Sequence, residues 1–403
     1  MAQALLTVAE ALARILDGAE PTEPETVPLL EAHGRVLAGD LEAKLTQPPF
    51  AASAMDGYAV RAADVEAPPA RLKVVGTSAA GRGYRGSVRP GEAVRIFTGA
   101  ALPDGADAIV IQENTEPAGD GVIVREGAPP KAYVRGRGID FAAGVTLLEA
   151  GRRLDARALT LAAAMGHDVV PVRSKPLVAI LATGDELVLP GTPPGPDQIV
   201  CSNPFGLAAL VSNAGGTPRV LGIARDSKED IAGKIGEAQG SDIIVTTGGA
   251  SVGDHDLVVP ALASLGMKLD FWKVAMRPGK PLLFGRLGKA RVLGVPGNPV
   301  SSLVCGRLFL VPLIRRLLGA AVTDEALETA TLTHALAANG PRQYYMRAVL
   351  ERSSRGPPRV TALALQDSSL LAPLAAADCL IVRAPDAPAL QAGAEVEILR
   401  LDF

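Results

Sequence analysis

The apolar positions of this chain divide it into segments of different predicted secondary structure. Residues 1–18 have helical spacing, and one face would carry Leu5, Ala9, Leu12, Ile15 and Leu16. Thr7 and Glu10 have the spacing of a capping box, and Gly18 stands where a left-handed residue commonly follows a helix. The chain is therefore predicted to open with one short amphipathic helix.

Residues 46–143 have a different pattern, in which clusters of Gly, Pro and Asp separate short apolar runs. The runs are 72–75, 93–97, 108–112 and 121–125. Runs of this length between turn residues predict strands. Residues 155–165 are rich in Ala and Leu and are followed by Gly166, which predicts a helix similar in character to the first. We infer that a β-rich module is inserted into a helical unit.

Beyond residue 175, buried strands alternate with helices. Strands are predicted at 177–182, 219–224, 242–246, 268–274 and 291–295, and helices near 204–213, 228–238, 257–265 and 300–318. Uninterrupted alternation of this kind predicts a doubly wound parallel sheet. After residue 323 the pattern returns to short strands, at 329–335, 344–351, 359–365, 379–384 and 395–399. These strands predict a small antiparallel, barrel-like β domain.

The predicted fold class is thus multidomain α/β plus β, with four domains. The 403 residues are too many for one ordinary domain. A discontinuous helical linker domain takes residues 1–45 plus 144–174, and the inserted β-rich domain takes 46–143. The α/β domain takes 175–323, and the C-terminal β domain takes 324–403.

Composition excludes several classes of protein. The 40 Lys and Arg residues nearly balance the 43 Asp and Glu residues, so no broad basic face is available for nucleic acid. The 48% of apolar residues excludes a mainly disordered chain. The longest apolar stretch, 303–318, is interrupted by three arginines and is too short for a membrane span. Three cysteines without a C-x-x-C pair favour neither disulfides nor a thiolate zinc site, so we expect a soluble, cytoplasmic protein.

Candidate site residues follow from the predicted sheet, because ligands collect beyond the carboxyl ends of parallel strands. The loops that follow the predicted strands therefore share one edge. They hold Thr183, Gly184, Asp185, Glu186, Asp226, residues 247–256, residues 276–281 and residues 296–301. Asp242 begins its strand, so it belongs to the opposite edge and is predicted to be structural.

Two of these loops have backbones suited to an oxyanion. One contains Gly248 and Gly249, followed by Ser251, and the other contains Gly297 and Asn298, followed by Ser301 at the start of a helix. Each alone is equally well explained as a tight turn between a strand and a helix. Their shared edge favours phosphate recognition.

The same edge is rich in carboxylates, which would repel a phosphate unless a hard cation lay between them. They are Asp185, Glu186, Asp226, Asp254 and Asp256. Mg²⁺ is the usual bridge, held by one or two carboxylates and by substrate phosphates. Solvated loop acids and helix caps are the alternative explanation. Lys273, Arg277 and Lys280 would neutralise the remaining charge, although a surface position would explain each of them as well.

Other hydrolytic and nucleotide-binding chemistries lack their motifs. The four histidines have no zinc-protease spacing, and the chain has neither a G-x-S-x-G elbow nor a P-loop. From spacing alone, Asp56 and Asp140 are ordinary turn acids.

Six motifs, spread along nearly the whole chain, together resemble the molybdopterin molybdenumtransferase family, whose eukaryotic counterparts include the C-terminal region of gephyrin. They are residues 53–59 (SAMDGYA), 95–100 (RIFTGA), 183–187 (TGDEL), 248–253 (GGASVG), 277–281 (RPGKP) and 296–301 (PGNPVS). The resemblance implies an elongated homodimer whose α/β domain binds molybdopterin. It also implies Mg²⁺-dependent insertion of molybdate into adenylylated molybdopterin with release of AMP, alongside other proteins of molybdenum cofactor biosynthesis.

The resemblance further implies an active cleft shared between subunits. In that cleft, catalytic Asp56, Thr98 and Asp140 would face catalytic Glu186 and the metal ligands of the partner subunit. The implied metal ligands are Glu186, Asp226 and Asp256. The implied substrate-binding residues are Thr183, Gly184, Asp185, Gly248, Gly249, Ser251, Lys273, Arg277, Lys280, Gly297, Asn298 and Ser301.

Three positions depart from the family pattern, and two other functions stay open. Ile139 stands where the family usually has Glu, Arg277 where it usually has Lys, and Asp367 where it usually has Gly, which leaves the role of Ser368 open. One alternative is a non-catalytic molybdopterin-binding or scaffolding protein of the same fold. The other is adenylylation of molybdopterin by ATP, which would need only the α/β domain. Nothing in the sequence separates molybdate from tungstate.

Overall fold

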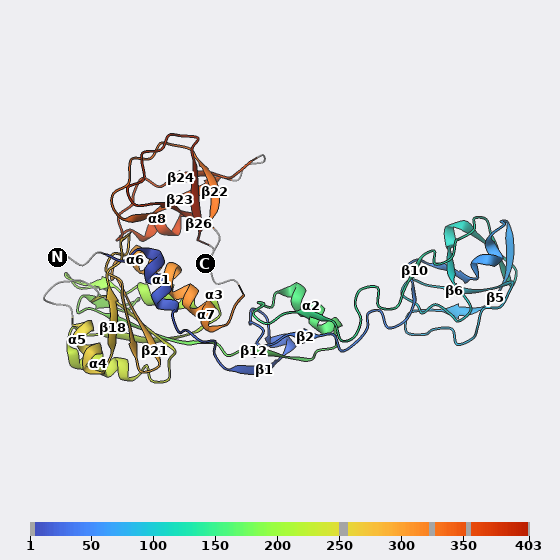
Figure 1. The fold of residues 1–403 in the computed structure, drawn as a ribbon, viewed down its shortest axis with the longest axis horizontal. Coiled ribbons are helices and arrows are strands. Elements are labelled where there is room, and N and C mark those ends of the chain that lie inside the picture. The colour runs from blue at the N-terminus through green and yellow to red at the C-terminus, as the bar shows by residue number, and fades with distance from the viewer. Residues whose placement is uncertain (1–4, 250–256, 322–326, 352–355, 402–403) are drawn as a thin grey trace.

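The computed structural model describes residues 5–249, 257–321, 327–351 and 356–401. Figure 1 shows an elongated molecule. The α/β domain and the C-terminal β domain lie together at one end, the inserted β module lies at the other, and a narrow linker joins them. No helix among the described residues is long and apolar enough to cross a bilayer.

The first helix, α1 (Val8–Leu16), begins at the predicted capping box and is followed by Gly18, whose φ is +57°. The buried side chains of α1 are Val8, Ala11 and Ile15, and all three join the core of the α/β domain. The predicted buried face was wrong at Leu5 and Ala9, which are exposed. Arg291 on the sheet donates to the carbonyls of Ile15 and Asp17 at the helix end. By its contacts, α1 packs with the α/β domain rather than with the linker.

The linker is built from segments on either side of the inserted module. Strand β1 (Pro24–Pro28) pairs antiparallel with β12 (Val169–Arg173), and β2 (Leu41–Glu42) pairs with β11 (Thr146–Leu148). Helix α2 (Ala156–Ala164) has Asp155 as its N-cap and is followed by Gly166 at φ +93°, as predicted. Two connections therefore run through the linker to the inserted module.

The inserted module is a six-stranded curled sheet in the order β7-β4-β6-β5-β9-β8. The predicted runs form β5 (Ala70–Ser78), β6 (Glu92–Ile96), β7 (Ala108–Ile111) and β9 (Gly121–Val124). The sequence pattern missed β4 (Gly57–Val60) and β8 (Thr115–Ala118). A methyl group on Gly57 would overlap the backbone of Val110 on the neighbouring strand, which explains the glycine there. Two short strands, β3 (Ala52–Ser53) and β10 (Val134–Arg135), pair where the chain passes between the linker and the inserted module (Figure 1).

The α/β domain has a six-stranded sheet in the order β16-β13-β17-β21-β20-β18. Four strands are parallel, namely β13 (Leu177–Thr183), β16 (Thr217–Ala224), β17 (Ile243–Thr247) and β21 (Ala290–Val295). The expectation of an all-parallel sheet is wrong at one side, where β20 (Leu283–Leu287) and β18 (Lys268–Trp272) run antiparallel. The predicted structural role of Asp242 is confirmed, because its carboxylate accepts from the Leu177 N–H at the start of β13.

Helices cover both faces of this sheet. One face packs against α3 (Asn203–Ala214), α6 (Pro299–Cys305) and α7 (Val311–Leu317), together with α1. A π-helical turn at Gly306–Leu310 joins α6 to α7 in the segment predicted as one long helix. The other face packs against α4 (Lys228–Gly236) and α5 (Val258–Ser264).

The C-terminal domain is a closed barrel, because β23 (Gln343–Glu351) pairs with both β24 (Arg359–Ala362) and β25 (Cys379–Arg383). The ring continues through β22 (Glu328–Leu332) and β26 (Glu395–Arg400). The barrel-like prediction is confirmed, but β22 and β24 are parallel rather than antiparallel. Two further elements were not predicted: β19 (Met276–Arg277), which pairs with β23, and α8 (Leu371–Ala375).

Candidate functional site

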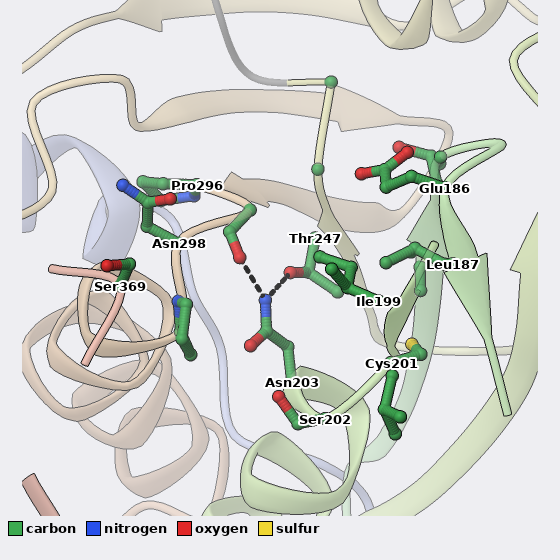
Figure 2. Close-up of a pocket in the computed structure, with 18 of the residues that line it drawn as sticks. Glu186, Leu187, Ile199, Cys201, Ser202, Asn203, Thr247, Pro296, Asn298 and Ser369 are labelled. Atoms are coloured by element: carbon green, nitrogen blue, oxygen red, sulfur yellow. Dashed lines mark hydrogen bonds between the residues drawn. The ribbon is translucent and has the colours of Figure 1, made fainter. Parts of the chain in front are cut away.

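A pocket of about 880 Å³ lies at the carboxyl ends of β13, β17 and β21. The first of these strands lies between β16 and β17, where the strand order of the sheet reverses. Helices then leave the sheet on opposite faces, and a crevice opens between the loops. Figure 2 shows Glu186 and Leu187 on one side of the pocket, Asn298 and Ser369 on the other, and Asn203 with Thr247 between them.

The turn after β17 brings backbone to the floor of the pocket. Gly248 and Gly249 both line it and both have positive φ, +99° and +58°. A methyl group on Gly248 would overlap the carbonyl oxygen of Thr183, and one on Gly249 would overlap the side chain of Val258. Glycine is therefore required twice for steric and conformational reasons, which keeps this backbone accessible to a ligand.

We expect Gly248→Ala to lower the free energy of unfolding by more than about 1 kcal/mol, because it combines a positive φ with a steric overlap. It should also weaken phosphate binding. Gly297→Ala is the matched control in the same pocket. Its φ is not in the left-handed region, and its methyl group would meet only Gly248 Cα at 3.6 Å, an ordinary contact. Chemical denaturation of both variants measures the difference, and equal stabilities would contradict this account of the turn.

The turn after β21 forms the adjoining wall. Gly297 and Asn298 line the pocket. The Asn298 amide donates to the hydroxyl of Ser368 at 2.8 Å, and the Val300 N–H donates to the Ser368 carbonyl at 3.1 Å. The C-terminal domain thus holds this turn through the loop 366–370. Ser301, predicted to bind substrate, is buried within α6 and does not line the pocket.

Among the described residues, the carboxylates of Glu186 and Asp226 line the pocket. Glu186 lies over Gly184, where any larger side chain would overlap its carboxylate. Asp185 does not line the pocket. Its carboxylate accepts from the Asp226 N–H at 3.1 Å, and the Asp185 N–H donates back to the Asp226 carboxylate at 3.4 Å. Asp185 therefore ties two loops together, and Glu186 is left to face the pocket.

The wall of the pocket includes no Lys or Arg among the described residues. The Lys273 ammonium lies 4.8 Å from the centre of the Trp272 ring, and the Arg277 guanidinium lies 4.5 Å from the centre of the Tyr344 ring. Lys280 is exposed and also lies outside the wall. A role for these three cations in binding stays a prediction.

Asp56 and Thr98 meet at a loop of the inserted module. The Thr98 N–H and hydroxyl both donate to the same Asp56 carboxylate oxygen, at 2.7 and 2.8 Å. These bonds, the backbone one first, lower the pKa of Asp56 below its usual range. The Asp140 N–H donates to the carbonyl of Gln47, on the other segment that joins the inserted module to the linker. Asp56 and Thr98 belong to the inserted module, which lies at the far end of the molecule from the α/β domain (Figure 1), whereas Asp140 precedes Phe141, which packs in the core of the linker.

Three candidate site residues, Ser251, Asp254 and Asp256, lie outside the described residues. Among the residues that the structure describes, no group of three or more His, Cys, Asp or Glu side chains could hold a metal. The pocket itself offers the carboxylates of Glu186 and Asp226, and Mg²⁺ needs only one or two carboxylates when phosphates and water complete its shell.

The sequence pattern missed several residues of the wall. Asn203, in the first turn of α3, donates to Thr247 and to the Gly297 carbonyl (Figure 2). Ser369 donates through its hydroxyl to the Asp367 carboxylate at 2.6 Å. Cys201 also lines the pocket, and burial, with a smaller effect of the charge on Glu186, raises the pKa of its thiol. Only a weak signal in the sequence pointed to Asn203: it stands directly before Pro204, the first residue of a predicted helix.

Three protein-family models match consecutive parts of the chain. Residues 6–166 match the MoeA N-terminal region (domain I and II), residues 179–316 match a domain described as a probable molybdopterin binding domain, and residues 329–401 match the MoeA C-terminal region (domain IV).

Individual proteins are similar over most of their length. The molybdopterin molybdenumtransferase of a Nostoc species is 40% identical over 340 residues, which cover 82% of this chain and 78% of that protein. The molybdopterin molybdenumtransferase of Haemophilus influenzae is 34% identical over 98% of both chains. The crystal structure of a molybdopterin biosynthesis MoeA protein from a Pyrococcus species superposes with a TM-score of 0.85 at 32% identity, covering 99% of this chain and 100% of that one.

Proposed function

The chain belongs to the family of molybdopterin molybdenumtransferases, which insert molybdenum into molybdopterin, and we propose that its own substrates are molybdate and adenylylated molybdopterin. AMP would be the second product. The observation that carries this proposal is the pocket itself, in which two glycine-containing turns and two carboxylates meet at the strand-order reversal of the sheet.

The charge of the pocket supports a need for Mg²⁺. Its described wall holds the carboxylates of Glu186 and Asp226 but no Lys or Arg. A phosphoanhydride would be repelled by that wall without a hard cation, and carboxylate and phosphate oxygens are the ligands that Mg²⁺ prefers. When bound, Mg²⁺ would neutralise charge that develops on the phosphate oxygens. We propose Glu186 and Asp226 as its protein ligands, with Asp256 as a further candidate.

The residues of the wall would carry out the rest of the reaction. The backbone at Gly248–Gly249 and at Gly297–Asn298 would hold phosphate oxygens. Glu186 would accept a proton from the water that attacks the phosphoanhydride, and the bond between the bridging oxygen and the AMP phosphorus would break. The two dithiolene thiols of molybdopterin would then each form a bond to molybdenum, while one oxo ligand of molybdate takes up their two protons and leaves as water.

We also propose a homodimer with a shared site. Asp56 and Thr98 belong to the inserted module, which lies at the opposite end of the molecule from the α/β domain (Figure 1), so one chain does not bring them together with Glu186. Met55 and Phe97, the sequence neighbours of Asp56 and Thr98, are exposed apolar side chains, and so are Phe50, Tyr133 and Ile139. The neighbourhood of the pocket also exposes Leu189, Ile199, Val200 and Phe205. Apposition of these two surfaces in a pair of chains would bury both.

The setting we propose is the cytoplasm, among other proteins of molybdenum cofactor biosynthesis. All three cysteines are free and buried. That arrangement fits a reducing compartment.

Mass spectrometry of the pterin tests the proposed function. Incubation of the protein with adenylylated molybdopterin, Mg²⁺ and molybdate should convert the pterin to its molybdenum-bound form and release AMP in equal amount. Omission of Mg²⁺ should stop both events. Tight binding of the pterin without AMP release would instead support a scaffolding role, and formation of adenylylated molybdopterin from ATP would support the adenylylation alternative. Replacement of molybdate by tungstate in the same assay measures the preference between the two oxyanions.

A further inference from the structure

Asn203 connects the two turns that would hold phosphates. Its side-chain nitrogen donates to the hydroxyl of Thr247 at 2.7 Å and to the carbonyl of Gly297 at 2.7 Å. A carbonyl can only accept, so the amide nitrogen must face Gly297, and both of its hydrogens are used. Figure 2 shows this side chain between the two loops, with both bonds drawn.

The two turns are direct neighbours. A methyl group on Gly297 would lie 3.6 Å from Gly248 Cα, and the Gly248 N–H points toward the Val295 carbonyl at 3.4 Å. Thr247 is 2% exposed and immediately precedes Gly248, so its hydroxyl marks the position of the first turn. Gly297 belongs to the second turn. The pairing of β17 with β21 brings the two turns side by side, and a rigid amide bound to both fixes the remaining freedom in their distance and orientation.

Asn203 itself is held in place by packing. It begins α3, and the next residue, Pro204, is buried in the first turn of that helix. The helix packs through Leu207, Leu210 and Val211 into the core beneath the sheet. The amide is thus held by a third element, the packed helix α3, and not by either of the two loops that it connects.

We propose that Asn203 is a positioning residue, and that it sets the spacing of two phosphate subsites, one at the Gly248–Gly249 turn and one at the Gly297–Asn298 turn. The inference rests on the proposed function, in which the substrate carries two phosphates joined as an anhydride. Each turn takes one phosphate of the pair. A ligand that occupies both subsites depends on their spacing, whereas a ligand that occupies one does not.

Inorganic pyrophosphate and inorganic phosphate distinguish these cases, because the first can span two subsites and the second fills one. Calorimetric titration of the full chain in the presence of Mg²⁺ measures both. Asn203→Ala removes two hydrogen bonds and should weaken pyrophosphate binding by about tenfold, with phosphate binding changed by less than about twofold. Asn213→Ala, an exposed position at the other end of α3, is the matched control and should change neither.

A second variant protects the test against a local folding defect. Thr247→Val keeps the size of a buried side chain but removes the hydroxyl that Asn203 contacts. If Asn203 acts through Thr247, the Asn203→Ala/Thr247→Val double variant should bind pyrophosphate no more weakly than the weaker single variant. Equal losses of pyrophosphate and phosphate binding, unchanged pyrophosphate binding, or additive losses in the double variant would each overturn the proposal.

The titrations separate this inference from the proposed function. If Asn203→Ala selectively weakens pyrophosphate binding but the wild-type protein never releases AMP, the two subsites are supported and the catalytic proposal is refuted. Wild-type protein that releases AMP while Asn203→Ala retains full pyrophosphate affinity would refute the positioning role alone.

Discussion

Glu186→Gln is expected to lower the rate of AMP release by about 10²-fold or more, while the fold and the affinity for the pterin stay nearly unchanged. The variant keeps the size of the side chain and removes the charge needed for Mg²⁺ or for proton transfer. Glu186 lines the pocket and lies over Gly184, and the bonds that tie the two acidic loops together are made by Asp185 and Asp226. Loss of its charge should therefore affect turnover far more than stability.

Asp185→Asn is the matched control for this experiment, because it makes the same chemical change at the adjacent residue. The Asp185 carboxylate accepts from the Asp226 N–H outside the pocket, and an amide oxygen can accept the same bond. We expect this variant to retain most of its turnover. AMP release at saturating Mg²⁺ should be measured alongside thermal unfolding of the same preparations. A folded Glu186→Gln variant that releases AMP at the wild-type rate would refute the assignment.

Local signals explain why much of the fold was predictable. The Thr7–Glu10 capping box and the glycine after α2 act within one turn of chain, so the sequence alone contains the interaction. Three of the four parallel strands, β13, β17 and β21, are mostly buried apolar runs, and β16 is a partly exposed edge strand; all four were predicted. The antiparallel strand β20 (Leu283–Leu287) was missed, because five residues that contain Gly285 and Arg286 show no clear alternation. Pairing with β21 and β18 determines that strand, and neither pairing is visible in the local pattern.

The site was predictable only where one loop contributes backbone or charge by itself. Glycines at Gly248 and Gly249 and the acid at Glu186 follow directly from their positions after a strand. Asn203 was missed because its role lies in two bonds to residues 44 and 94 positions away. Ser369 reaches the pocket from the C-terminal domain, on a loop that buried Arg347 holds by donating to the carbonyls of Asp367 and Leu370. Such assembly depends on the packing of domains, which no single segment encodes.

Asp367, which stands where the family usually has Gly, contacts its own loop. Its carboxylate accepts from both the N–H and the hydroxyl of Ser369, and these bonds lower its pKa. The acid thus orders the loop from within and does not line the pocket. Ser368 remains available to accept from Asn298, so the departure from the family pattern leaves this contact intact.

Mixed dimers are expected to recover activity from two inactive chains. An Asp56→Ala chain and a Glu186→Ala chain should each lose nearly all AMP release when alone. If sites are shared, a heterodimer contains one site with both substitutions and one site with neither. A statistical mixture holds heterodimers as about half of its dimers, and each carries one intact site, so the mixture should recover about a quarter of the wild-type rate.

The controls follow from the geometry of the chain. Asp56→Ala mixed with Thr98→Ala should not recover activity, because both residues contact each other within the inserted module and both substitutions would affect sites built from that module. The two chains carry different affinity tags, are unfolded and refolded together, and are purified through both tags before AMP release is measured. Purified heterodimers should then reach about half of the wild-type rate per dimer, since one of their two sites is intact. Heterodimers that form in good yield yet release no AMP would show that Asp56 and Glu186 do not serve one shared site, because the wild-type residues would then be present without restoring the chemistry.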